Sequence, residues 1–109
     1  MSGYYDLKRS GDQYLFNLKA ANHEVILTSE RYTTKTSAQE GIRSVQQNSP
    51  IDARYQRKMA SDNSPYFTLT ASNGQTIGRS EMYSSTSARD NGIASVKTNG
   101  PTTTVKDNT

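Results

Sequence analysis

The sequence Ser-Glu-x-Tyr occurs twice, as "SERY" at 29–32 and as "SEMY" at 80–83. A serine hydroxyl can act as a nucleophile, but it needs a general base within hydrogen-bond reach, and that base is most often a histidine. The chain has a single histidine, His23, and the second motif has no equivalent of it. An enzyme that uses these motifs is therefore the least favoured of the hypotheses considered below.

A structural role explains the same motifs. Each lies where a predicted strand gives way to a predicted helix. A glutamate close to a helix N-terminus meets unpaired N–H groups and the positive end of the helix dipole, which stabilises by about 0.3–1 kcal/mol. A tyrosine can fill the corner between sheet and helix with its hydroxyl at the rim. We expect this role for the repeat-matched corner residues Ser29, Glu30, Tyr32, Ser80, Glu81 and Tyr83.

Other site chemistries lack their residues. Without cysteine the chain has no thiolate nucleophile, disulfide or cysteine-based zinc site. A metal site would rest on carboxylates, and these show no calcium-loop spacing. Neither glycine-rich nucleotide-binding pattern occurs. We predict no metal and no cofactor, and we expect His23 to serve only as a turn residue that tolerates an unusual backbone angle.

Composition predicts a small folded protein with a thin core. The chain has 109 residues, of which 31% are hydrophobic, and it contains seven tyrosines. We expect one domain, 1–109, because halves of about 50 residues would bury too little surface alone. No apolar run is long enough to span a membrane, so we expect a cytoplasmic protein. The net charge of +3 is modest for a protein that binds phosphates.

A duplication organises the chain. At an offset of 51 residues, 16–50 and 67–101 share fourteen identities over 35 ungapped positions, among them "GI.SV" at 41–45 and 92–96. Repeats of this size are single supersecondary units that need a neighbour to bury their apolar face. We expect two repeats, about 3–52 and 53–106, that share one core in a monomer with pseudo-two-fold symmetry.

Each repeat opens with signals for strands. In the first, "YYDLKR" precedes a Ser-Gly-Asp turn, and "YLFNLKA" then alternates with period two, which predicts a hairpin. Asn22-His23 and Asn73-Gly74 form short turns that lead into a third strand in each repeat. We therefore expect three antiparallel strands per repeat.

The pattern then becomes helical. Ala38, Ile42 and Val45 are spaced for one face of a helix, and Gly41 would let that helix approach the sheet closely. Thr34 or Thr36 is placed to cap it, and Ser37 with Glu40 could form a capping box. The second repeat has Ala88, Gly92, Ile93 and Val96, with Ser85 or Ser87 as the cap.

The run "FNLKAANHEVILTSERYTTKTSAQEGIRSV" and its echo "FTLTASNGQTIGRSEMYSSTSARDNGIASV" resemble the YegP-like family of small bacterial proteins of unknown function. The resemblance implies an α+β fold of two tandem β-β-β-α-β repeats in one shared, antiparallel-rich sheet. Both helices lie on one face, and the last strands, 53–58 and 103–106, are exchanged between the repeats. Two residues depart from the pattern: Arg57 stands where the first repeat has Leu7, and His23 stands where the second repeat has Gly74.

The remaining candidate is the sheet face opposite the helices, which we expect to expose basic and aromatic side chains. Lysine, threonine and tyrosine also suit an ordinary solvated sheet face. The leading hypothesis is a non-enzymatic binding or interaction module; the sequence identifies no partner, and a protein and a nucleic acid are the two candidates. The alternative is a weak single-stranded nucleic-acid binder that stacks bases on this face. The candidate binding surface comprises Tyr4, Lys8, Asn17, Lys19, Arg54, Lys58 and Tyr66.

Overall fold

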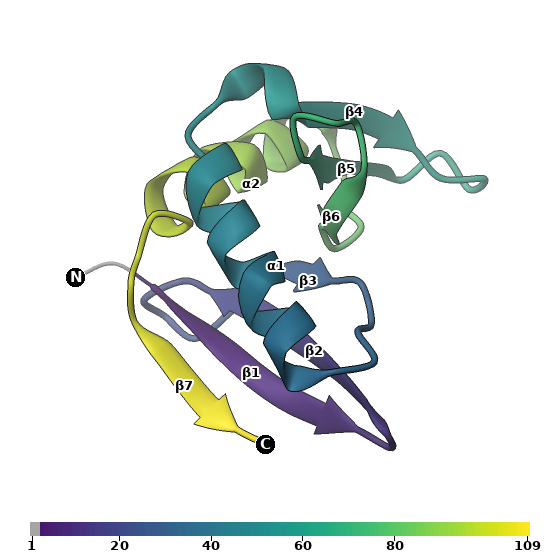
Figure 1. The fold of residues 1–109 in the computed structure, drawn as a ribbon. Helices are drawn as coiled ribbons and strands as arrows, with labels where there is room; N and C mark the ends of the chain where they lie inside the picture. Colours follow the sequence, from purple (N-terminus) through teal and green to yellow (C-terminus); the bar gives the residue numbers. More distant parts are fainter. Residues whose placement is uncertain (1–2) are drawn as a thin grey trace.

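The chain runs twice through three strands and a helix and ends in a seventh strand (Figure 1). This computed structural model describes residues 3–109. Its elements are β1 (Tyr4–Ser10), β2 (Gln13–Lys19), β3 (Val25–Ser29), α1 (Lys35–Asn48), the short 3₁₀ helix η1 (Asp52–Arg54), β4 (Tyr55–Met59), β5 (Pro65–Thr70), β6 (Thr76–Arg79), α2 (Thr86–Asn99) and β7 (Val105–Asn108). The predicted α+β class is confirmed.

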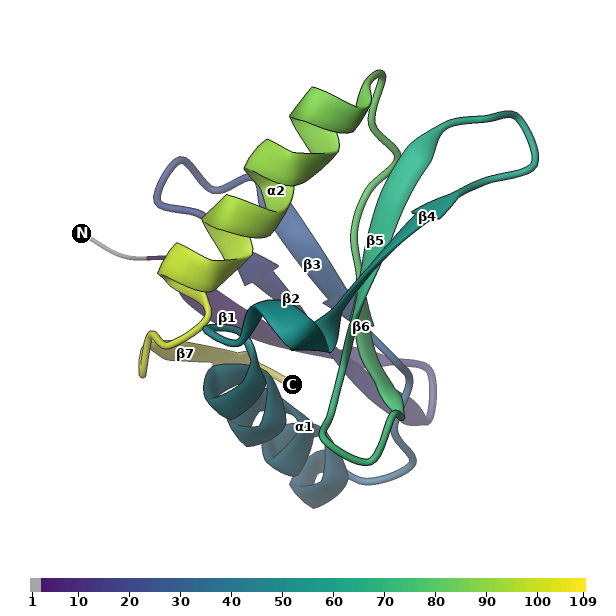
Figure 2. The same cartoon turned by 90° about the horizontal axis from the view of Figure 1, so that it is seen from above.

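All seven strands form one sheet in the order β4-β5-β6-β3-β2-β1-β7. The pseudo-two-fold axis passes between β3 and β6, the innermost strand of each repeat. Every pairing is antiparallel except that of β1 with β7. The β4–β5 hairpin projects at the opposite end of the sheet from β7 (Figure 2). One antiparallel-rich sheet shared by both repeats is therefore confirmed.

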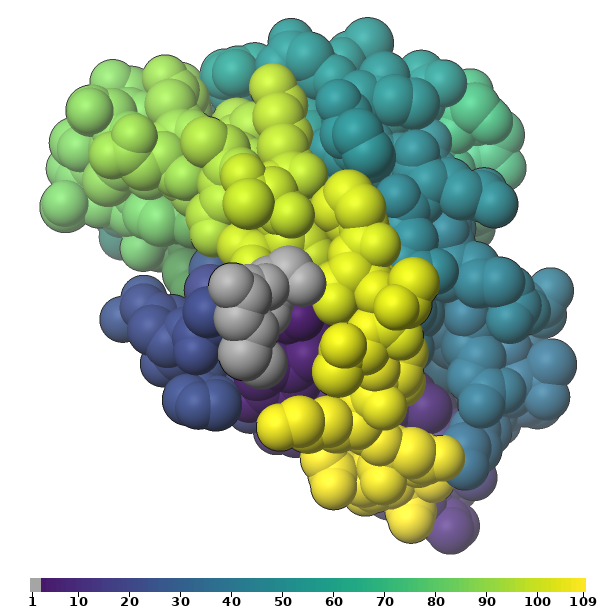
Figure 3. All heavy atoms as spheres, turned by 90° about the vertical axis from the view of Figure 1, so that its left-hand side faces the viewer, coloured from purple at the N-terminus to yellow at the C-terminus, as the bar shows by residue number. Residues whose placement is uncertain are grey.

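The strands that follow the helices are exchanged, as predicted. β4 follows α1 and pairs with β5 of the second repeat, and β7 follows α2 and pairs in parallel with β1 of the first. The C-terminal segment lies alongside β1 (Figure 3). Residues 105–108 of the C-terminal tail are thus an ordered strand at one end of the sheet.

The apolar faces of the two helices pack into the core. Ile42 and Ile93 are 3% and 2% exposed, and they pack in one cluster with the inward-facing residues of both repeats. Burying one such side chain stabilises by about 1.5–3 kcal/mol. Arg57 is excluded from this core, since it is exposed whereas its counterpart Leu7 is buried.

Matched hydroxyls cap both helices. Thr34 Oγ1 accepts the N–H of Ser37 at 3.0 Å, and Ser85 Oγ accepts the N–H of Ala88 at 3.0 Å. The predicted Ser37–Glu40 capping box is wrong, because the helix begins at Lys35 and Ser37 already lies inside it. Neither helix has an acidic residue in its first turn, and Glu30 and Glu81 lie four residues before the caps Thr34 and Ser85, so their effect on the helix N-termini stays a prediction.

Two backbone features depart from simple strands. The β2–β3 pairing shifts register after Leu18, and as a result both Ile26 and Leu27 are buried. Such a bulge breaks the strict alternation of side chains that the sequence pattern assumes. At the turns, His23 (φ 71°) and Gly74 (φ 84°) adopt the same left-handed conformation, as their shared position predicts.

Candidate functional site

The two Ser-Glu-x-Tyr corners are built alike, and their serine hydroxyls have partners. Ser29 Oγ accepts the N–H of Phe16 at 2.9 Å and donates to the carbonyl of Glu30 at 2.7 Å. Ser80 Oγ makes the matching bonds to Phe67 and Glu81 at 2.9 and 2.8 Å. The Ser29 hydroxyl joins β2 to the segment that follows β3, and the Ser80 hydroxyl joins β5 to the segment that follows β6. Neither hydroxyl directs its proton to a general base.

The corner tyrosines pack against the helices. Tyr32 stacks on Phe16 with 6.3 Å between ring centroids and 11° between planes, and Tyr83 stacks on Phe67 in the same way. Each hydroxyl lies where a Cβ on Gly41 or Gly92 would stand. Burial raises the pKa of both hydroxyls, which therefore stay protonated at neutral pH. This close approach explains the glycine that opens each "GI.SV".

Strand pairing brings part of the candidate binding surface together on the face opposite the helices, here called the open face. Tyr4 is paired with Lys19, and Lys8 lies beside them on β1. Tyr66 and Lys58 are paired with each other at the far end, on β5 and β4. One row crosses all seven strands through Lys106, Asp6, Asn17, Thr28, Arg79, Thr68 and Gln56.

Arg54 lies apart from this group. It belongs to η1, and its Nε donates to Asn48 Oδ1 at the end of α1, at 3.0 Å. The Arg54 side chain is therefore hydrogen-bonded to α1 and not to the other residues of the candidate binding surface.

Local contacts occupy the β1 end of the open face. Tyr4 is 7% exposed, Lys106 Nζ lies 4.2 Å from its ring centroid, and its hydroxyl lies 2.8 Å from His23 Nδ1. Asp6 pairs with Lys19 at 3.1 Å and accepts a hydrogen bond from Asn108 at 2.7 Å. Burial alone would raise the pKa of Asp6, but these bonds and the nearby lysines lower it overall. The Tyr4 ring is thus covered.

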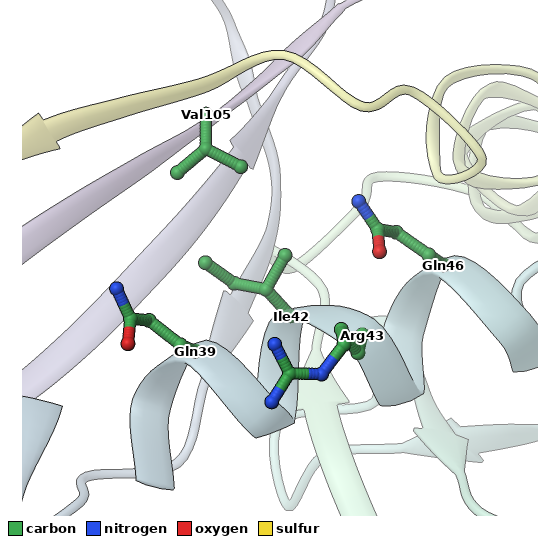
Figure 4. A pocket seen from close by; sticks show the side chains of 5 residues that line it. All are labelled: Gln39, Ile42, Arg43, Gln46 and Val105. Carbon is green, nitrogen blue, oxygen red and sulfur yellow. The ribbon is translucent and has the colours of Figure 1, made fainter. Parts of the chain in front are cut away.

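A second site lies between α1 and β7 and has a volume of about 350 Å³. We call it the α1/β7 groove; Gln39, Ile42, Arg43, Gln46 and Val105 line it (Figure 4). Val105 is 40% exposed, and its side chain points toward Ile42. Gln46 Nε2 donates to the carbonyl of Thr102 at 2.9 Å. This groove could not be predicted from the sequence, because Val105 is far from α1 along the chain and the resemblance predicts for 103–106 only an exchanged last strand.

Arg43 stands out among the residues of the groove. Its side chain is exposed, and it makes neither a hydrogen bond nor an ion pair with any residue of 3–109. Gln39 lies one turn before Arg43 on α1, and its side-chain amide also has no hydrogen-bond partner in that range. Polar groups with free donors therefore lie beside the apolar side chains of Ile42 and Val105, which face each other across the groove.

The equivalent place in the second repeat is occupied by charges. Lys97 Nζ lies 2.6 Å from Asp52, and Arg57 lies 3.3 Å from Asp90 and 3.9 Å from Asp52. The hydrogen bond and charge of Lys97 lower the pKa of Asp52. We call Asp52, Arg57, Asp90 and Lys97 the α2/β4 ion cluster. No strand of the described range 3–109 covers β4 there, since β4 ends the sheet.

The sequence profile of a domain of unknown function, DUF1508, matches residues 10–56 and again 60–107. The chain belongs to the DUF1508 family. It is 71% identical over 109 residues to a UPF0339 protein of Bordetella pertussis, covering all of this chain and 98% of that one. It is 56% identical to the UPF0339 protein YegP of Escherichia coli K12, with full coverage of both chains. The family resemblance is confirmed.

Solved structures of DUF1508 relatives agree with the fold. The solution NMR structure of a UPF0339 protein from Shewanella oneidensis superposes with a TM-score of 0.92 at 61% identity, over 98% of this chain and 92% of that one. That of yegP from E. coli, a protein of unknown function, gives 0.93 at 55% identity, over 99% and 94%. Over 3–109, neither helix is long and apolar enough to cross a membrane, and no three potential metal ligands cluster.

Proposed function

We propose that this DUF1508 protein is a non-enzymatic interaction module that binds an extended segment of another protein in the α1/β7 groove. One observation carries the proposal: the same position in the two repeats has opposite character. In the first repeat it is an open groove beside Ile42 and Val105. In the second repeat the paired charges of the α2/β4 ion cluster stand at this position.

The strand next to the groove favours an extended ligand. β7 is the last strand of the sheet, so one side of its main chain faces no other strand of the described residues. An added strand would lie about 4.8 Å beyond it and make main-chain hydrogen bonds. Every second side chain of that strand would then point toward α1, beside Val105 and Ile42. This is strand addition with a pocket for alternate side chains.

The corner geometry supports the non-enzymatic part of the proposal. Ser29 and Ser80, the candidate nucleophiles, hold backbone groups in both repeats with nearly identical distances. A catalytic serine needs its hydroxyl directed to a base. The equal construction of the two corners is what a structural joint requires.

Peptide display tests the proposal. We expect 12-residue peptides selected on the full chain to shift the amide signals of β7 and of residues 39–46 in NMR titrations. Val105→Lys should weaken their binding at least tenfold, because it puts a charge into the apolar part of the groove. Ile51→Lys is the matched control, since Ile51 is equally exposed and does not line the groove. Shifts confined to other surfaces, or unchanged affinity of Val105→Lys, would overturn the proposal.

A second candidate function is weak binding of single-stranded nucleic acid on the open face. Pairing and alternation place Lys8, Lys19, Lys58, Arg79 and Lys106 on that face, with Lys8, Lys19 and Lys106 close to Asp6 and Lys58 at the far end. If they contact phosphates, a labelled twelve-residue oligothymidine should bind at about 50 mM salt and weaken strongly at about 200 mM. Lys19→Glu with Lys106→Glu should abolish that binding. An absence of binding at the lower salt would remove this candidate.

A further inference from the structure

We infer that the peptide bound in the α1/β7 groove carries an acidic side chain that pairs with Arg43, two positions from an apolar side chain that packs on Val105. This inference rests on the proposed function and adds the chemistry of the partner. A guanidinium holds a carboxylate through two parallel hydrogen bonds, which selects for it over a neutral group.

The first support is that Arg43 is available. The cations close to β7 are already engaged: Lys35 pairs with Asp107, and Lys106 lies over the Tyr4 ring on the open face. Arg43, on the rim of the groove, has no partner within the described residues 3–109. Its charge therefore faces whatever enters the groove.

The second support is the pattern of β7 itself. Val105 points toward Ile42, and Asp107, two positions later on the same side of the strand, pairs with Lys35 of α1. The last strand thus already presents an apolar side chain and, two positions later, an acidic side chain to α1. Arg43 lines the groove beside Val105, so an acidic side chain on a strand added outside β7 would pair with Arg43 as Asp107 of β7 pairs with Lys35.

The second repeat shows why only one groove is expected to bind. Ala94 stands at the position equivalent to Arg43, and Asp90 at that equivalent to Gln39. Asp90 is already paired with Arg57. Alanine has no positive charge to pair with an acid, and within the described residues no further strand lies beside β4 to form a groove with α2. We therefore expect no binding of an acidic peptide in the second repeat.

The test uses three sets of ten-residue peptides, all with amidated C-termini, so that any carboxylate belongs to a side chain. Each set has valine at a fixed position and glutamate, glutamine or lysine two positions later, with the other positions randomised. Affinities are measured by fluorescence anisotropy at low salt against the full wild-type chain, Arg43→Gln and Arg43→Glu. Arg79→Glu is the control, because it changes the net charge equally on the opposite face.

We expect the glutamate set to bind the wild type about tenfold tighter than the glutamine set. Arg43→Gln should remove that difference, and Arg43→Glu should reverse it in favour of lysine, while Arg79→Glu leaves it intact. Val105→Lys should weaken all sets. Equal binding of the glutamate and glutamine sets that is still lost in Val105→Lys would overturn the inference and leave the proposed function standing.

Four further results would also count against it. No binding of any set to the groove would overturn both the inference and the proposed function. An equal loss in Arg79→Glu would show nonspecific attraction. If the same sets synthesised with free C-termini bind and the amidated sets do not, the ligand is a terminal carboxylate and not an acidic side chain. Competition by an oligothymidine would identify the groove as a nucleic-acid contact.

Discussion

The two repeats are alike in their helices and differ where the pseudo-two-fold axis brings equivalent residues together. Leu27 and Gly78 occupy the same position in their repeats, and a Cβ on Gly78 would lie 2.6 Å from Leu27 Cδ2. Ser49 and Gly100 form a second such pair, because a Cβ on Gly100 would collide with the Ser49 side chain. At each place the interior has room for one side chain. At these two positions the larger side chain of one repeat is therefore accommodated by a glycine in the other.

The repeats also differ at the ends of the sheet. β7 covers the edge of β1, and Leu7 beneath it is buried. Nothing covers β4 among residues 3–109, and Arg57 replaces that leucine. A charged side chain that points inward on an edge strand discourages pairing with another molecule. The difference at 7 and 57 thus follows from which edge the last strand occupies.

The largest expected effect tests the likeness of the helices. Ile42→Asp and Ile93→Asp should each lower the free energy of unfolding by about 4 kcal/mol, because each places a charge in the core. The two losses should agree within about 1 kcal/mol, since the surroundings match. Chemical denaturation measures both, with Gln47→Asp and Thr98→Asp as controls on the exposed helix faces. A much smaller loss for Ile93 would show that the second repeat contributes less to the core.

The next effect concerns the axis. Gly78→Leu should cost about 2–3 kcal/mol through overpacking against Leu27. The double exchange Leu27→Gly with Gly78→Leu should recover most of this loss, because the single side chain returns to the same space from the other strand. Thermal unfolding of the single and double variants measures it. A double variant no more stable than Gly78→Leu alone would contradict the account of the axis.

A smaller, local effect concerns β7. The hydrogen bond and charge of Lys35, with hydrogen bonds from Thr109, lower the pKa of Asp107 to about 2, and the pKa of Asp6 is lowered as well. Because both folded values lie below the unfolded value of about 3.9, their stabilisation is present above it and is lost as the pH falls through the folded values. We expect β7 amides to lose hydrogen-exchange protection between about pH 4 and pH 2, while β5 keeps its own.

Asp6→Asn with Asp107→Asn provides the control for this pH effect. It should loosen β7 at neutral pH and remove most of the pH dependence of its protection. Equal protection of β7 in the wild type at the two ends of that range, about pH 4 and about pH 2, would show that main-chain pairing alone holds the strand.

The smallest effect on stability is expected at the β4 edge. Arg57→Leu should change the free energy of unfolding by less than about 1 kcal/mol, because Arg57 is exposed. It should nevertheless increase self-association, which sedimentation velocity measures across a concentration series. Lys58→Leu, on the same strand but facing the other side, is the control. A monomer at all concentrations would mean that Arg57 does not protect this edge.

Much of the fold could be predicted from identities between the repeats. Phe16 with Phe67 and the paired "GI.SV" segments predict which faces are buried. The sequence narrows each helix start to two candidate caps, Thr34 or Thr36 and Ser85 or Ser87, of which the structure uses Thr34 and Ser85. The bulge at Ile26 could not be predicted, since it depends on how β2 and β3 fit together. The α1/β7 groove was also out of reach, because it joins residues that only the parallel pairing of β1 and β7 brings close.

The amino-acid sequence by itself determined the two repeats, their helix stripes and their capped ends, because periodicity and capping depend on residues close together in the chain. Only the tertiary structure decided what the differences between the repeats mean. Leu27 against Gly78, Leu7 against Arg57 and Arg43 against Ala94 are plain substitutions in an alignment. In the shared sheet each repeat has different neighbours. Leu27 therefore packs against Gly78 at the axis, Arg57 protects an exposed edge strand, and Arg43 has a charge that is free to bind a partner.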